Sequence, residues 1–207
     1  MNFDILISFV IATATLAISP GPDNIFVLIQ SITYGKKQGM AVVSGLLSGC
    51  IIHTSFVAFG LSSLIQSNVE FLFVLKFLGA GYMLYLAYRV FKSSKTINTN
   101  AIATKRKSLL DLFKQGFIMN VINPKVSIFF MAFFPAFLFS KTQSLVLQFF
   151  ILGFLFMVTS LLIFSTLVFF SSSVGAALKS NNRYGAVLNW SQIAVFLGIA
   201  IFIVLTP

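Results

Sequence analysis

Polar and charged side chains stand inside two long apolar segments of this sequence, in each case directly beside a proline. The candidate binding residues that share this position are Asp23, Asn24, Asn120, Asn123 and Lys125. A carboxylate can receive an ammonium group, an ammonium can receive a carboxylate, and amides both donate and accept hydrogen bonds. These residue types predict a binding site for a hydrophilic solute, with no catalytic residue assigned.

Helix-breaking residues adjoin both groups: Pro20, Gly21 and Pro22 precede Asp23, and Pro124 precedes Lys125. Each proline removes a backbone donor and clashes with the preceding turn. At membrane depth, the backbone groups that are freed survive only where they are buried in protein or line a wet cavity. A charge at a helix centre also costs about 2.5–3.5 kcal/mol. The alternative is that the prolines merely kink ordinary helices of a bundle. Against this alternative, a charged residue lies beside a helix break in both segments.

The composition excludes a soluble domain. Of the 207 residues, 58% are hydrophobic and only 9% are charged, whereas soluble domains carry about 25% charged residues. The single cysteine, Cys50, excludes intramolecular disulfides and thiolate metal clusters. The first residues lack a positive n-region, so we expect no cleavable signal peptide. No cofactor motif is present in the sequence.

Six apolar runs are long enough to cross a bilayer as helices, which requires about 20 residues. We expect an all-α polytopic membrane protein with spans at Ile5–Thr33, Met40–Leu61, Phe71–Val90, Gly116–Phe139, Leu145–Phe170 and Ala186–Leu205. They form a single transmembrane domain over residues 1–207. It divides into repeat one at about 1–91, a cytoplasmic linker at about 92–113 and repeat two at about 114–207.

Each half opens with an interrupted helix and adds two further spans. Three spans per half give the halves opposite orientations, which is how inverted-repeat transporters are built. The match is uneven, because Ile5 lies farther from Pro22 than Gly116 lies from Pro124. A fourth span that began near Leu109 would agree better, and the sequence leaves both starts open.

Basic residues predict the orientation, because Lys and Arg concentrate in cytoplasmic loops. The net charge is +10, and its placement between apolar runs favours membrane orientation over nucleic-acid binding. The first, third and fifth loops hold most of the basic residues: Lys36, Lys37, Arg89, Lys92, Lys95, Lys105, Arg106, Lys107, Lys114, Lys179 and Arg183. We therefore expect these loops in the cytoplasm and both termini outside it.

Motifs along nearly the whole chain resemble the lysine-exporter (LysE/RhtB) family. They are Pro20-Gly21-Pro22-Asp23-Asn24, the Gly45/Gly49 pattern, Lys76 to Leu86, Asn120-Val121-Ile122-Asn123-Pro124-Lys125 with Phe129-Phe130, and Gly198. The resemblance implies a multi-pass exporter of amino acids or related metabolites in a bacterial plasma membrane, driven by the proton gradient through alternating access. The sequence departs from the family in Asp23, since asparagine commonly follows Pro-Gly-Pro there.

An exported amino acid is a zwitterion and needs contacts of both charges. We expect Asp23 to receive the ammonium, and Lys125 with N–H groups at a helix N-terminus to receive the carboxylate. A buried pair in which Asp23 and Lys125 merely neutralise each other is compatible with this role. Asp23 is also the first proton-coupling candidate, because burial disfavours the charged form of a carboxylate.

His53 is the second proton-coupling candidate, since imidazole titrates near neutral pH. It shares the small-residue helix face of Gly45 and Gly49, which predicts an inward position. A histidine that only hydrogen-bonds between helices is the alternative. The same glycine face permits close contact within the monomer or in a homodimer. Among other polar residues, Tyr82 or Tyr85 is a candidate for lining a path, and Asn189 to Gln192 for a cavity wall.

Two other function classes compete with an amino-acid exporter. An intramembrane enzyme could use the thiol and imidazole of Cys50 and His53, at i and i+3, but no third residue orients the histidine. A divalent-cation exporter would need several oxygen ligands, or clustered His and Cys. Because Asp23 is the only carboxylate deep in a span, no metal site is predicted. The expected partners are a small-molecule substrate, protons and the lipid bilayer.

Overall fold

The computed structural model describes residues 3–19, 21–67, 69–92, 106–173 and 182–205, and within these ranges the chain is helical with no strand. The elements are α1 (Phe3–Ile18), α2 (Pro22–Tyr34), α3 (Lys36–Ser55), η1 (Phe56–Leu61), α4 (Ser62–Ser67), α5 (Val69–Lys92), α6 (Leu109–Val121), α7 (Pro124–Ile128), η3 (Phe129–Phe133), η4 (Phe134–Phe137), α8 (Leu145–Phe169) and α10 (Asn182–Leu205).

Several of these helices can cross a membrane. Lys36–Ile65, Phe73–Lys92 and Leu145–Phe169 are long and apolar enough by themselves, and two bent helix pairs raise the number of candidate spans in the described residues to as many as five. The apolar part of α10, Asn189–Leu205, is shorter. The all-helical membrane class is therefore confirmed, while the arrangement of six spans as two repeats stays a prediction.

Both predicted interruptions are present. Phe3–Ile18 and Pro22–Tyr34 meet at 61°, and Leu109–Val121 and Pro124–Phe137 meet at 50°. Each second segment begins with a proline at its first position, where the missing N–H costs nothing. Of the predicted breaking residues, Pro20 lies outside the described residues.

The second interrupted helix begins at Leu109, which is one of the two starts that the sequence left open. Ser108 caps this helix, and its side chain accepts a hydrogen bond from the Asp111 backbone N–H at 3.1 Å. A cap of this kind stabilises a helix by about 1 kcal/mol. Residues 109–113 are therefore helical, while the division of the chain into two repeats and a linker stays a prediction. With the start at Leu109, the two interrupted helices become more similar in the length of the segment before the break.

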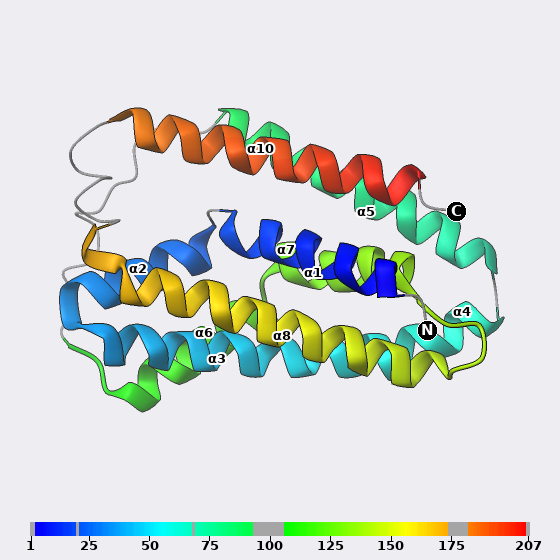
Figure 1. Ribbon diagram of the computed structural model, residues 1–207, viewed down its shortest axis with the longest axis horizontal. Coiled ribbons are helices and arrows are strands. Elements are labelled where there is room, and N and C mark those ends of the chain that lie inside the picture. Colours follow the sequence, from blue (N-terminus) through cyan, green and yellow to red (C-terminus); the bar gives the residue numbers. More distant parts are fainter. Residues whose placement is uncertain (1–2, 20, 68, 93–105, 174–181, 206–207) are drawn as a thin grey trace.

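The helices form three layers (Figure 1). α5 and α10 lie side by side as one layer, and α3, α6 and α8 make up the opposite one, with α1 and α7 between them. The marked N and C ends lie at the same end of the molecule. The end of α2 and the starts of α6 and α10 lie at the other end.

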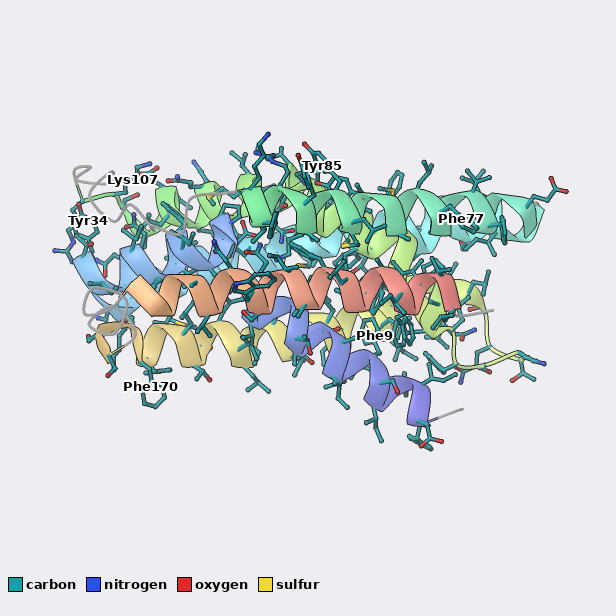
Figure 2. The ribbon with its side chains drawn as sticks, turned by 90° about the horizontal axis from the view of Figure 1, so that it is seen from above. Phe9, Tyr34, Phe77, Tyr85, Lys107 and Phe170 are labelled. Atoms are coloured by element: carbon teal, nitrogen blue, oxygen red, sulfur yellow. The ribbon has the colours of Figure 1, made fainter. Side chains whose placement is uncertain are left out.

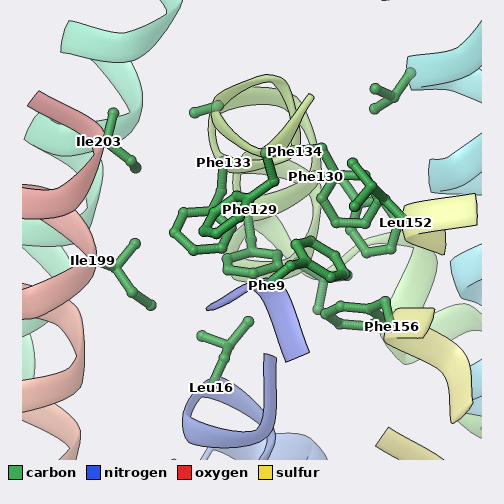
Figure 3. Packing of buried hydrophobic residues seen from close by; sticks show 14 of the residues in the cluster. Phe9, Leu16, Phe129, Phe130, Phe133, Phe134, Leu152, Phe156, Ile199 and Ile203 are labelled. Carbon is green, nitrogen blue, oxygen red and sulfur yellow. The ribbon is translucent and has the colours of Figure 1, made fainter. Parts of the chain in front are cut away.

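A cluster of aromatic rings forms the core where α1, η3, η4 and α8 meet (Figure 3). Phe130 stacks on Phe134 with ring centroids 4.2 Å apart, and Phe9 meets Phe134 edge-on at 5.1 Å. Phe156 of α8 contacts Phe130 at 4.8 Å. Aromatic pairs of this geometry contribute beyond their buried area, so the segment after the second break is fixed against α1 and α8.

Glycines bring α3 and α6 into backbone contact. A Cβ on Gly45 would clash with the Phe113 carbonyl of α6, and one on Gly116 would clash with the Val42 carbonyl of α3. The small-residue face of α3 is thus used within the monomer, which answers the question that the sequence left open. The outer faces are apolar (Figure 2), and Phe77 and Tyr85 of α5 are 52% and 51% exposed, as expected of surfaces in contact with lipid.

Candidate functional site

At the first break, the side chain of Asn24 hydrogen-bonds a backbone carbonyl that the break leaves without a helical partner. α1 ends at Ile18, and α2 begins at Pro22 after Gly21 in extended conformation. Asn24 reaches back from α2, and its Nδ2 donates to the Ala17 carbonyl at 2.7 Å. This carbonyl belongs to the last turn of α1, where backbone acceptors lack helical partners. One function of Asn24 is therefore to satisfy the backbone across the break.

The second break is also closed by an asparagine. Asn123 is the cap of α7, and its Oδ1 accepts a hydrogen bond from the Lys125 backbone N–H at 3.0 Å. Asparagine is among the strongest capping residues, because its side chain replaces a missing helical partner. The capping bond leaves the Nδ2 of Asn123 free to act elsewhere.

The two breaks are in direct contact. The Nδ2 of Asn123 donates to the Asp23 Oδ2 at 2.8 Å, a bond that joins residues one hundred positions apart in the sequence. The second carboxylate oxygen of Asp23, Oδ1, is buried and has no hydrogen-bond partner among the described residues. The prediction that the breaks lie together is confirmed, and one acceptor atom of the site is unused.

Lys125 lies beside the first break without pairing directly with Asp23. Its Nζ donates to the Ser19 carbonyl at 3.5 Å and lies 5.5 Å from the Phe196 ring centroid. Among the described side chains, the hydrogen bond to the Asp23 carboxylate comes from Asn123 and none comes from Lys125. The anion and the cation are thus neighbours, each with a different partner.

A small cavity, here called the inner cavity, lies on one side of these residues. Its polar lining comprises Asp23, Asn24, Asn120, Lys125 and Ser160, and its apolar lining comprises Leu16, Ala17, Leu46, Leu47, Cys50, Val126, Phe156 and Phe164. Four of the five predicted binding residues therefore share one cavity. Its free space is about 40 Å³, which suffices for water but lies far below the roughly 300–1,000 Å³ of ligand pockets.

A larger cavity, the outer cavity, lies between the breaks and the α5–α10 layer. It has a volume of about 340 Å³, and its lining comprises Gly21, Pro22, Tyr82, Leu86, Arg89, Val90, Asn123, Pro124, Lys125, Gln192 and Phe196. Among the residues that the structure describes, only Lys125 lines both cavities. The sequence pointed to Tyr82 and Gln192 as wall residues, but it treated Arg89 only as a charge that orients the chain.

His53 is buried as expected, but it lies apart from Asp23. Its Nε2 is 3.1 Å from the backbone carbonyl of Asn120, and its ring contributes to a different pocket beside Phe130. Asn120 connects the two places, because it also lines the inner cavity. The structure thus links His53 to the breaks through one residue and does not bring it to the carboxylate.

The side chains of Cys50 and His53 have different hydrogen-bond partners and are not bonded to each other. The Cys50 Sγ lies 3.9 Å from the Asn120 Oδ1, while His53 binds the carbonyl of the same asparagine. A thiol that is to be activated by an imidazole needs that imidazole within hydrogen-bond reach. The described residues also contain no group of three or more His, Cys, Asp and Glu side chains that could hold a metal ion.

Comparison with known proteins gives the class. Residues 14–206 match the LysE type translocator model, so the chain belongs to this family of membrane transport proteins.

The chain is 27% identical over 187 residues to the homoserine/homoserine lactone efflux protein of Salmonella typhimurium, which covers 90% of each chain. It is 25% identical over 193 residues to the leucine efflux protein of an Enterobacter species, with 93% and 92% covered. An uncharacterised membrane protein of Bacillus subtilis is 27% identical over 141 residues, 64% of this chain and 67% of that protein. No solved structure matches.

Proposed function

We propose that this protein exports amino acids or closely related metabolites across a bacterial plasma membrane, coupled to protons. The observation that carries the proposal is the contact between the breaks, where Asn123 binds Asp23 beside Lys125. Family membership and two relatives named for efflux of homoserine and leucine support the same class of cargo.

The charges at the breaks suit a zwitterion. The unpartnered Oδ1 of Asp23 can accept hydrogen bonds from an ammonium group. The ammonium of Lys125 can bind a carboxylate, since among the described residues it has only a backbone carbonyl at 3.5 Å and the Phe196 ring as partners. Asn120 and Asn123 can supply further donors and acceptors. A substrate with both charges would then replace weak contacts by charge-assisted hydrogen bonds.

Proton coupling is assigned to Asp23, with His53 as a relay. A carboxylate that alternately binds the substrate ammonium and a proton links the export of substrate to the transport of protons. Histidine side chains serve as proton shuttles in many proteins, and His53 is joined to the inner cavity through Asn120. Exchange of substrate for proton at one carboxylate requires no further charged group.

We also propose alternating access, which the small size of the inner cavity supports, because at about 40 Å³ it must widen to admit an amino acid. We assign the movement to two inverted repeats of three spans. Equivalent contacts support this division: α3 packs on α6, and α8 packs on α1. We assign both termini to the outside of the cytoplasm, since the marked N and C ends lie opposite the end where α2 ends and α6 begins.

Efflux from cells loaded with dipeptides tests the proposal. Cells expressing the intact protein, its Asp23→Asn variant or its Lys125→Ala variant receive dipeptides of alanine, leucine, threonine or lysine. We expect the intact protein to export at least one of these amino acids and both variants to lose that export. Manganese resistance without amino-acid efflux would favour a divalent-cation exporter instead. Export of neither cargo would refute the proposal.

A further inference from the structure

The outer cavity contains a cation that belongs to neither break. Arg89 lies at the end of α5, where its side chain is exposed and lines this cavity together with Tyr82 and Gln192. Lys125 lines the same cavity from the side of the breaks. Two cations from different helices and two uncharged hydrogen-bonding groups therefore line one space of about 340 Å³.

The lining of the outer cavity is unbalanced in charge. No aspartate or glutamate is among the described residues that form it. Arg89 makes no ion pair with any described carboxylate, and the one deep carboxylate, Asp23, faces the inner cavity. A cavity with a single sign of charge and low-dielectric walls concentrates ions of the opposite sign. This lining therefore selects an anion.

From this lining we infer that the outer cavity is a second binding site, which captures the substrate carboxylate before it reaches the breaks. A guanidinium binds a carboxylate through two parallel hydrogen bonds, and Tyr82 and Gln192 can donate further ones. Leu86, Val90 and Phe196 give the same cavity apolar wall for an uncharged side chain. The ligand class is an amino acid with a free carboxylate.

Lys125 makes the transfer between cavities continuous. Because it lines both, a carboxylate can pass from Arg89 to Lys125 without losing a cationic partner. The order of the contacts along the path is then Arg89, Lys125 and Asp23. Arg89 is three residues from the end of α5 at Lys92, on the side that the basic loops assign to the cytoplasm. An exporter must collect its substrate from that side.

The inference rests on the proposed function, and everted membrane vesicles test it, since uptake into them corresponds to export. The probes are an amino acid that the dipeptide panel identifies as exported and its carboxamide, which lacks the anion. We expect Arg89→Gln to raise the KM of the amino acid about ten-fold, because a charge-assisted contact is lost. The KM of the carboxamide should stay unchanged, and Arg89→Lys should recover most of the loss.

Lys92→Gln is the matched control. It removes the same charge from the same helix end, and Lys92 does not line the cavity. An effect shared by Arg89→Gln and Lys92→Gln would assign Arg89 to membrane orientation and overturn the inference. So would an equal rise in the KM of the carboxamide. If Arg89→Gln changes nothing while Asp23→Asn abolishes transport, the second site is refuted and the proposed function stands.

Discussion

The two helix breaks use the same backbone device and carry opposite charges. Each begins its second segment with a proline, and each uses an asparagine to satisfy the backbone. The first break adds a carboxylate with one unpartnered oxygen, and the second adds an ammonium. Amides thus close the backbone at both breaks, which leaves the charged groups available for a ligand. The opposite charges match the two ends of an amino acid.

Neutralising either charge should give the largest effect. We expect Asp23→Asn and Lys125→Met each to reduce export by about 100-fold, because truncating one partner of a buried charge contact costs about 2–5 kcal/mol. Initial efflux rates at equal amounts of protein in the membrane measure this loss. Asp111→Asn and Lys114→Met are the controls, since both side chains are exposed, and they should export as the intact protein does. Normal export by either charge variant would contradict a role for that charge in transport.

Next in size is the effect of separating α3 from α6, the helix that leads into the second break. Gly45→Val places a side chain against the Phe113 carbonyl, and such overpacking typically costs about 1–3 kcal/mol. We expect a lower Tm in detergent and reduced export. Gly81→Val is the control, because nothing lies within 4 Å of its Cβ position. Equal Tm values for the two variants would contradict the close contact of α3 and α6.

The smallest effect should separate the two asparagines. Asn24→Ala removes one backbone hydrogen bond, whereas Asn123→Ala removes a helix cap and the bond to Asp23. We expect the Asn123 variant to export about ten times more slowly than the Asn24 variant, while each loses about 1 kcal/mol of stability. Efflux and thermal unfolding, measured on both variants, separate the effect on export from the effect on stability. A larger export defect in Asn24→Ala would show that the contact between the breaks is secondary.

Local sequence chemistry predicted the breaks well. Prolines and charges inside apolar runs identified both interruptions, and the glycine spacing in α3 predicted that His53 lies inward. These features could be predicted because each depends on a few adjacent residues. The sequence left the start of the fourth span open, because Asp111 and Lys114 lower the local hydropathy, and the Ser108 cap marks the helix start at Leu109.

Contacts between distant elements could not be predicted in this way. Tyr82 and Arg89 lie seven residues apart on one face of α5. Their meeting with Gln192 of α10 depends on how α5 packs against α10, which the sequence pattern does not encode. Likewise, the sequence left a direct pair of Asp23 and Lys125 open, and the structure shows Asn123 on the carboxylate instead. The roles of these residues in binding stay predictions.

Equilibrium binding to the purified protein tests most directly whether Asp23 and Lys125 receive the two ends of one substrate. Three radiolabelled ligands are compared: the exported amino acid, its carboxamide, and its deaminated acid. The intact protein should bind the amino acid most tightly. In the Asp23→Asn variant, the amino acid should no longer bind more tightly than the deaminated acid. In the Lys125→Met variant, it should no longer bind more tightly than the carboxamide. Equal weakening of all three ligands by both variants would contradict the assignment of one charge to each break.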